Sequence, residues 1–295
     1  MKEIEFIQKR RMFLLISLSC VILTIIVLII NKGLNLGLDF TGGILIQVKI
    51  FDKNINISNL REILAKNGIS KGVELQNILS LEQDAKEFII KLKAETQESA
   101  INTIKGILDS NNLQYEIKSI EYVGPAIGKH LTKKALYAIA FSLLGIIVYV
   151  AVRFGSSIWG VAGVIALIHD VFLTIGFLTI LGKEISLTVI AALLTLAGYS
   201  INDTIVIFDR IRENIKLLRK EKLDKIMNIS INQTLTRTLL TSGTTLIAVL
   251  SLFILGNQVI KDFALSLVFG VIVGTYSSIF IASALVLEYK LRTKQ

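Results

Sequence analysis

The chain has 295 residues, of which 53% are hydrophobic, and its mean hydropathy is +0.66. This composition excludes an ordinary soluble enzyme and favours an integral membrane protein. The formal net charge is +9 at pH 7. Residues 31–130 carry equal numbers of basic and acidic side chains, so the surplus lies in the apolar remainder. Membrane topology and anionic lipid headgroups account for it, and no nucleic-acid partner is expected.

Six apolar segments are long enough, at roughly 17–25 residues each, to cross a bilayer as helices. The segments are Met12–Ile30, Ala135–Val152, Ile158–Leu181, Ile185–Phe208, Thr238–Leu255 and Phe263–Leu287. The first follows Lys9, Arg10 and Arg11, as a secretory signal would. It is longer than the apolar core of about 7–15 residues that a cleavable signal has, which predicts an uncleaved anchor helix.

Lys and Arg collect before the first segment, after the last, and between the fourth and fifth. The loop expected at 209–237 is the richest, with Arg210, Arg212, Lys216, Arg219, Lys220, Lys222, Lys225 and Arg237. This asymmetry predicts that both termini are cytoplasmic. Ile211, Ile215 and Leu218 lie at helical spacing in this loop, which favours a helix along the inner membrane surface. A solvated basic arm is the alternative.

Residues 31–130, between the first two spans, are predicted to form an extracytoplasmic α+β domain. Period-two and helical patterns predict the order βαββαβ, a ferredoxin-like fold. The strands are expected at 43–50, 73–79, 87–93 and 115–122, and the helices at 58–67 and 97–111. Ser58 and Thr96 are the candidate helix caps. The chain's one cysteine, Cys20, lies in the first span, so no disulfide is expected and the domain suits binding or leverage better than catalysis.

The stretch LGLDFTGG, at residues 36–43, joins the first span to this domain. Gly42 and Gly43 are expected to permit a tight turn. Asp39 is interpreted first as a turn or cap residue.

The fourth span carries Asn202 and Asp203 inside an apolar run. Asp203 lies about 26 Å from the outer end of the helix at Ser186, at roughly 1.5 Å per residue, which places it in the cytoplasmic third of the bilayer. A charge exposed to lipid there costs at least a few kcal/mol. The side chain should therefore face protein or water, on the same arc as Thr195, Tyr199 and Asn202, and Asn202 is a further candidate for proton conduction.

Arg237, in the fifth span, reaches a similar depth on the next, antiparallel helix. Polar and small residues share its face, which predicts a helix–helix contact. They are Gln233, Thr241, Thr244 and Ala248. Asp203 and Arg237 are therefore expected to meet within the membrane.

His169 and Asp170 lie near the middle of the third span. Ionisable groups within a membrane mark proton or ion pathways by default. If a helix shift made or broke the pair of Asp203 with Arg237, it would change the affinity for a proton, and protonation would bias the shift in return. The plainer alternatives are a fixed ion pair and a His169 side chain that bonds a carbonyl. Gly270 and Gly274 form a GxxxG face that predicts helix contact.

Five stretches together resemble the SecF family of the bacterial SecDF protein-export complex, within the resistance-nodulation-division superfamily. They are LGLDFTGG at 36–43, VGPAIG at 123–128, ALIHD at 166–170, AGYSINDTIVIFDRIREN at 197–214 and INQTLTRTLLTSGTTL at 231–246. The resemblance spans nearly the whole chain.

The resemblance implies half of a twelve-helix unit completed by SecD, which uses the proton motive force to assist preproteins at the SecYEG channel in the cell inner membrane. YajC and YidC are further candidate partners; no cofactor and no enzymatic activity are expected. The family's proton-conducting carboxylate and arginine match Asp203 and Arg237, and its His-Asp pair matches His169 and Asp170. The membrane carboxylate of SecD is absent here, so no complete proton path is expected from this chain alone.

Three other functions remain open on the sequence alone. Half of a lipid or small-molecule exporter is one, although such exporters usually have larger extracytoplasmic loops. A passive scaffold for the translocation channel is the second. The third, an intramembrane protease using Asp170 and Asp203, is disfavoured because their depths differ by about 10 Å at the usual rise per residue.

Overall fold

The computed structural model describes residues 4–52, 54–67, 69, 73–78, 85–92, 96–155 and 157–292. The chain divides into two compact units, a helical bundle of residues 1–35 and 136–295 and a small domain of residues 36–135. The sequence placed the borders of the small domain at 31 and 130. Within the described residues, six helical segments are long and apolar enough to cross a membrane, which confirms the predicted number.

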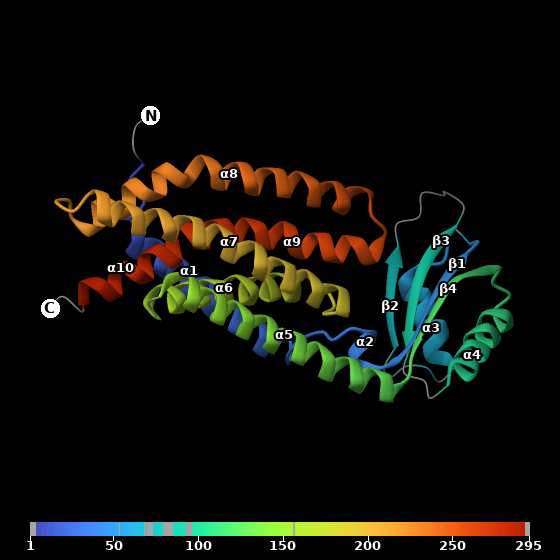
Figure 1. Ribbon diagram of the computed structural model, residues 1–295. Helices are drawn as coiled ribbons and strands as arrows, with labels where there is room; N and C mark the ends of the chain where they lie inside the picture. The colour runs from blue at the N-terminus through green and yellow to red at the C-terminus, as the bar shows by residue number, and fades with distance from the viewer. Residues whose placement is uncertain are drawn as a thin grey trace. The chain divides into compact units, whose positions relative to one another are not determined.

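The spanning helices (Figure 1), except α6, are longer than the apolar runs that predicted them. They are α1 (Arg10–Ile30), α5 (Pro125–Phe154), α6 (Ser157–Ile180), α7 (Leu187–Leu217), α8 (Leu223–Leu255) and a last span in three parts. Those parts are α9 (Gln258–Ser277), a π-helical turn η1 (Ser278–Ala282) and α10 (Ser283–Arg292). The extension arises because hydropathy marks where apolar surface ends, whereas the backbone hydrogen bonds of a helix continue into polar sequence.

The predicted loop over 209–237 is wrong. α7 continues to Leu217 and α8 begins at Leu223, so residues 218–222 alone form the turn. Arg, Glu and Lys are good helix formers, so a charged stretch does not end a helix. Ile211 is fully buried in the bundle core and not spread along a membrane surface.

α6, α7 and α9 pack against one another, with α8 against α7 and α9, and α1 against α6. Two glycines on α9 permit the close approach to α7, which confirms the predicted contact face. A Cβ at Gly270 would lie 2.5 Å from Leu196, and one at Gly274 would lie 3.2 Å from Ser200. The central helices are thus fixed by backbone proximity as well as by apolar burial.

α5 packs differently, since most of its side chains are exposed. Near its end, Val150 and Phe154 are buried, and the Phe154 ring contacts Trp159 and Phe208.

The N-terminal segment is held against α8 by hydrogen bonds. The Asn228 side chain accepts hydrogen bonds from the backbone N–H groups of Phe6 and Ile7, at 2.9 and 3.4 Å. Asn232 exchanges bonds with both backbone groups of Ile4. The Phe6 ring packs edge-on against Phe280 in the π-helical turn. We call this segment, residues 4–7, the N-terminal clasp.

The small domain has the predicted order of strands and helices, here β1 (Gly43–Ile50), α3 (Ile57–Lys66), β2 (Val73–Ile78), β3 (Lys86–Leu92), α4 (Gln97–Ser110) and β4 (Tyr115–Val123). Its sheet is antiparallel with strand order β2-β3-β1-β4. Alternate side chains of the strands meet the apolar faces of α3 and α4. The buried core includes Ile44, Ile46, Val48, Leu60, Leu64, Phe88, Ile90, Ile104 and Leu108.

The helix caps of this domain are predicted only in part. Thr96 caps α4, where its hydroxyl accepts from the Ser99 N–H at 3.4 Å, as expected. α3 is capped by Asn56 and not by Ser58, with a bond of 2.8 Å from the Asn59 N–H. Asn and Ser are both strong caps, so the sequence alone does not choose between neighbouring candidates. The expected strand ends at 79 and 93 lie outside the described residues.

The glycine pair forms the predicted turn into β1. A short helix, α2 (Leu38–Thr41), has Asp39 in its first turn and is followed by Gly42 and Gly43 with φ of +68° and +134°. A Cβ at Gly43 would lie 2.7 Å from the Leu92 carbonyl oxygen. Gly43 is therefore required both for its backbone conformation and for space.

We predict that Gly43→Ala destabilises the small domain by roughly 1–3 kcal/mol, because it adds backbone strain and a clash. Thermal unfolding and limited proteolysis of the full chain in detergent would measure this. Gly106→Ala is the matched control, since a Cβ there meets nothing within 4 Å and α4 gains helix propensity. Equal stability of the two variants would contradict the role assigned to Gly43.

Candidate functional site

Asp203 lies on the buried face of α7, with 3% of its surface exposed. Its carboxylate accepts a hydrogen bond of 3.5 Å from the Ser242 hydroxyl on α8. The Ser242 hydroxyl also receives a bond of 3.1 Å from the Tyr199 hydroxyl and lies 2.7 Å from the Thr275 hydroxyl on α9. Three helices thus contribute hydroxyls to one short network that ends at the carboxylate.

The predicted ion pair between Asp203 and Arg237 is not formed. Within the described part of the chain, no salt bridge reaches either side chain, and Arg237 is exposed. Asn202 is also exposed, although it directly precedes the buried Asp203. Consecutive residues point about 100° apart around a helix, so the two divide between the surface and the interior.

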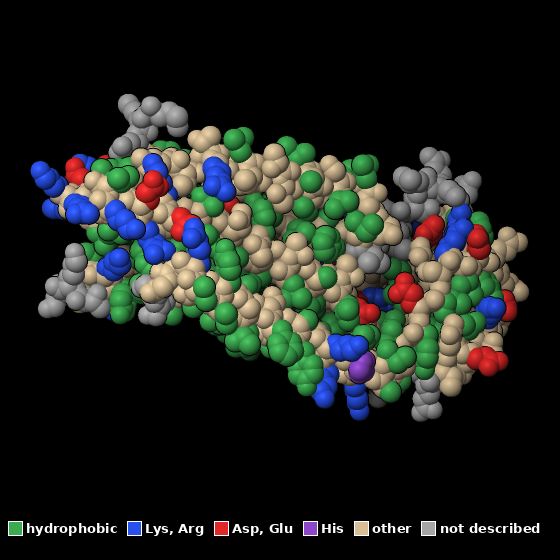
Figure 2. All heavy atoms as spheres, in the orientation of Figure 1, with side chains coloured by type: hydrophobic (Ala, Val, Ile, Leu, Met, Phe, Trp, Pro, Cys, Tyr) green, Lys and Arg blue, Asp and Glu red, His purple; other side chains and the backbone are tan. Residues whose placement is uncertain are grey.

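Asn202 and Arg237 line a polar cleft of about 540 Å³ between α5, α7 and α8. The rest of its lining is Tyr149, Arg153, Ile205, Val206, Asp209, Arg210, Glu213, Gln233 and Thr234. Arg153 pairs with Asp209 across α5 and α7, and Arg210 bonds both Glu213 and Gln233 at 2.6 Å. Lys and Arg side chains gather at this end of the bundle, which we call the basic end (Figure 2). Water and ions can therefore approach within one residue of Asp203.

Asp170 lies on α6 and is fully buried. One carboxylate oxygen accepts from the hydroxyls of Ser200 on α7 and Ser277 on α9, each at 2.6 Å. The other oxygen lies 2.9 Å from Nδ1 of His169. His169 Nε2 is buried and has no hydrogen-bond partner among the described residues. Asp170 is thus a junction of three helices.

The sequence identified the ionisable groups but not their partners. Ser200, Ser242, Thr275 and Ser277 were not singled out, because a hydroxyl in an apolar span most often bonds a carbonyl of its own helix. The sequence offers one signal for such hydroxyl partners: a serine within one turn of a predicted carboxylate, as Ser200 lies near Asp203.

The polar face of α8 is also placed differently from expectation. Gln233, Arg237, Thr244 and Ala248 are exposed, and Thr241 is half-buried. α8 packs within the bundle through another face. The buried residues of that face include Met227, Ser230, Ile231, Thr234, Thr238 and Ser242. The predicted contact is therefore made only in part: Gln233 bonds Arg210 and Asn214 of α7, whereas Thr244 and Ala248 are exposed.

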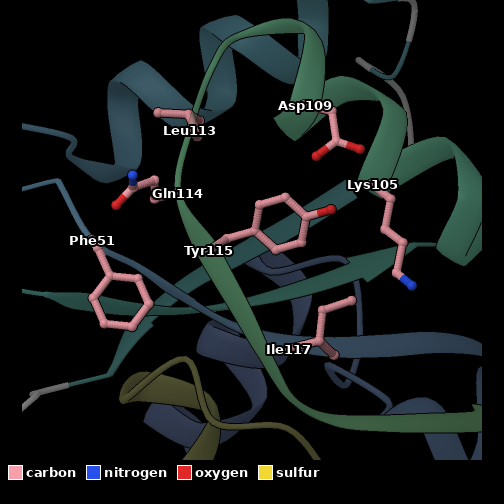
Figure 3. A pocket seen from close by; sticks show the side chains of 7 residues that line it. All are labelled: Phe51, Lys105, Asp109, Leu113, Gln114, Tyr115 and Ile117. Atoms are coloured by element: carbon pink, nitrogen blue, oxygen red, sulfur yellow. The ribbon is translucent and has the colours of Figure 1, made fainter.

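A second, shallower cleft of about 630 Å³ lies in the small domain, where β1, α4 and β4 meet. Figure 3 shows its lining of Phe51, Lys105, Asp109, Leu113, Gln114, Tyr115 and Ile117. Burial raises the pKa of the Tyr115 hydroxyl above its usual value, and its hydrogen bond to Asp109 raises that pKa further. Among the described residues, no three His, Cys, Asp or Glu side chains group closely enough to hold a metal ion.

These features define a polytopic membrane protein with an inserted α+β domain and ionisable side chains buried in its spans. Residues 103–292 match the family of protein export membrane proteins described as SecD/SecF, C-terminal, and residues 27–50 match the SecD/SecF GG motif. The chain is 45% identical over 292 residues to the protein translocase subunit SecF of Calditerrivibrio nitroreducens, covering 96% of this chain and 93% of the relative. The chain therefore belongs to the SecD/SecF family, as a member of SecF type.

Longer relatives contain a region that is similar to this chain. SecDF of Thermus thermophilus is 42% identical over 264 residues, which cover 89% of this chain and 35% of that protein. A crystal structure of SecDF from the same genus, described as a translocon-associated membrane protein, matches with a TM-score of 0.87 at 40% identity. The match covers 98% of this chain and 39% of that chain. A SecF-type chain thus occupies a defined portion of a fused protein.

We predict that Asp109→Asn lowers the pKa of Tyr115 toward its ordinary value, because it removes the negative charge that opposes ionisation of the hydroxyl. The fall is partial, since burial is the larger cause and persists. Ultraviolet titration of tyrosinate measures it, and Tyr115→Phe identifies which titration belongs to this residue. An unaltered titration in Asp109→Asn would mean that the carboxylate does not act on Tyr115.

Proposed function

We propose that this protein is the SecF subunit of a proton-driven accessory complex that assists protein translocation across the cell inner membrane. The observation that carries the proposal is Asp203, a carboxylate buried in a membrane span and one residue from a polar cleft. Buried ionisable groups in spans are costly and commonly serve transport. The names of the relatives support the assignment to protein translocation.

Asp203 is the proposed proton carrier. When ionised, the carboxylate accepts the Ser242 hydrogen bond; when protonated, it becomes a donor itself, and the hydroxyl network must reorient. Because Ser242 also bonds Tyr199 and Thr275, reorientation alters contacts among α7, α8 and α9. Protonation and helix packing are then linked, so each biases the other.

Arg237 is proposed to favour the ionised state from the cleft. A small rotation of α7 or α8 that brought the guanidinium to Asp203 would stabilise the carboxylate, and its withdrawal would favour proton uptake. The structure then corresponds to the separated arrangement. Each proton that falls through the membrane potential supplies about 2.3 kcal/mol per 100 mV to such a motion.

The basic end is proposed to be cytoplasmic and the small domain extracytoplasmic. The support is the gathering of Lys and Arg where α7 ends and α8 begins, according to the positive-inside rule (Figure 2). α1 begins at the same end of the bundle as α10 ends, as the ion pair of Arg10 with Glu288 at 2.8 Å requires. Both termini are therefore cytoplasmic in this proposal. The strand order of the small domain supports a ferredoxin-like fold.

SecD is the proposed direct partner, on the precedent of the fused SecDF relative. The exposed face of α8 suits such a contact, because small and hydroxyl residues let a neighbouring helix approach closely. SecYEG, YajC, YidC and the preprotein follow from the resemblance as further partners. The proposed role needs neither a cofactor nor covalent chemistry.

We predict that Asp203→Asn abolishes proton flux in vesicles reconstituted with SecD, and with it the proton-driven part of translocation. Asn keeps the shape of the side chain but exchanges no proton. Asp224→Asn is the matched control, since it makes the same change of charge at an exposed position at the start of α8. Unchanged flux and unchanged translocation in Asp203→Asn would leave only a scaffold role.

We predict that Ala248→Trp reduces co-purification of SecD with this chain by about tenfold or more, since a bulky ring on the small face of α8 would separate packed helices. Ile247→Trp is the control. Ile247 is 68% exposed on the adjacent apolar side, where lipid accommodates the larger side chain. Equal recovery of SecD with both variants would place the contact elsewhere.

A further inference from the structure

The two buried carboxylates of the bundle have different surroundings. Asp170 has three hydrogen-bond contacts of 2.6, 2.6 and 2.9 Å, whereas Asp203 is contacted by the hydroxyls of Ser242, at 3.5 Å, and of Thr241. We propose that Asp170 is a positioning residue for Asp203 and not a second proton carrier. Its function is to hold α7 and α9 so that their hydroxyls orient Ser242. The inference rests on the proposed role of Asp203.

Hydrogen-bond donors surround Asp170. Its Oδ2 receives two serine hydroxyls and its Oδ1 faces the ring nitrogen of His169. A proton added to either oxygen would meet a hydrogen already pointing at that atom, so at least one donor would have to turn away. Hydrogen bonds to a charged group are stronger than those between neutral groups. Protonation of Asp170 would therefore disturb at least one of these contacts, two of which join α6 to α7 and α9.

His169 serves as a hydrogen-bond donor of fixed orientation to Asp170. Because the neighbouring carboxylate is an acceptor, the ring hydrogen belongs on Nδ1, and Nε2 is then a bare acceptor. A charged ring would instead place a second N–H at Nε2, which has no partner among the described residues. Burying an unpaired donor on a charged ring is the costlier arrangement. The neutral ring therefore serves to orient Asp170.

Asp170 is also separated from the water-accessible cleft. It is fully buried, and the cleft is lined by residues of α5, α7 and α8 with none from α6. Asp203, by contrast, directly follows the cleft residue Asn202. A proton arriving through the cleft meets Asp203 without passing Asp170.

Two short connections along the chain link Asp170 to Asp203. On α7, its donor Ser200 follows Tyr199, whose hydroxyl bonds Ser242. On α9, its donor Ser277 lies two residues after Thr275, whose hydroxyl also bonds Ser242. By hydrogen-bonding Ser200 and Ser277, Asp170 fixes the rotation of α7 and α9. These two helices carry Tyr199 and Thr275, which contact Ser242, the donor to Asp203.

The packing around these serines is tight enough to transmit that constraint. A Cβ at Gly274 would lie only 3.2 Å from the Ser200 Cβ, so α7 and α9 touch at this level. Directly after Ser277, the helix changes to the π-helical turn of Ser278–Ala282. Turns of this kind interrupt the regular pattern and occur often at functional sites. Ser277 is thus held at a break in its helix, where its bond to Asp170 fixes the register.

The test compares two replacements of Asp170 in vesicles that contain the complete complex with SecD. Asp170→Asn keeps one oxygen for Ser200 and Ser277, and its amide can donate to Nδ1 of His169 once the ring hydrogen moves to Nε2. Proton flux should remain within about threefold of the parent, with an unchanged pH profile. Asp170→Ala removes all three bonds and should lower flux by about tenfold or more, because α7 and α9 are then released.

Loss of flux in Asp170→Asn to the level of Asp203→Asn, with normal recovery of SecD, would overturn the inference and make Asp170 a carrier. The proposed function would survive that result. If Asp203→Asn itself left flux unchanged, the proposed function would fail instead.

A second pair of variants keeps the test valid if either replacement of Asp170 fails to assemble. Ser277→Ala leaves every ionisable group in place but releases α9, so the pH midpoint of flux should move by at least about half a unit, or threefold in proton affinity. Ser266→Ala is the control, a buried serine on the same helix that bonds only the backbone of Asp262. An unmoved midpoint in Ser277→Ala would contradict the inference.

Discussion

The arrangement of the bundle depends on one constraint: a carboxylate in an apolar interior must be met by donors, and a membrane span offers few. Asp170 and Asp203 meet this constraint with hydroxyls drawn from neighbouring helices. The helices that supply them, α7, α8 and α9, all pack against one another in the bundle. Burial of the carboxylates and packing of the helices are therefore coupled, because a donor can move away only if its helix moves.

Most of the fold could be predicted from the sequence, because the signals are local. Six apolar runs gave six spans, and period-two alternation gave the strands of the small domain in their order along the chain. The predicted loop over 209–237 failed because hydropathy reports side-chain polarity, whereas Arg and Glu continue the backbone of a helix. The prediction of Ser58 as the cap of α3 failed because Asn56 and Ser58 are similar candidates for one position.

The candidate site could be predicted only as a set of residue types. Asp203 and Asp170 were identified because a carboxylate in an apolar run is conspicuous. Their partners Ser242 and Ser277 lie on other helices, and depth along a span does not determine rotation about its axis. Arg237 lies five residues before Ser242, the α8 residue that bonds Asp203, so it lines the cleft and is not paired with Asp203.

The N-terminal clasp has a consequence for biogenesis. Phe6 and Ile7 are synthesised more than two hundred residues before their partner Asn228. The ring beneath Phe6 belongs to Phe280, which is made later still. During membrane insertion, α1 therefore enters the bilayer before residues 4–7 have their partners. These contacts form only after α8 and the π-helical turn have been synthesised.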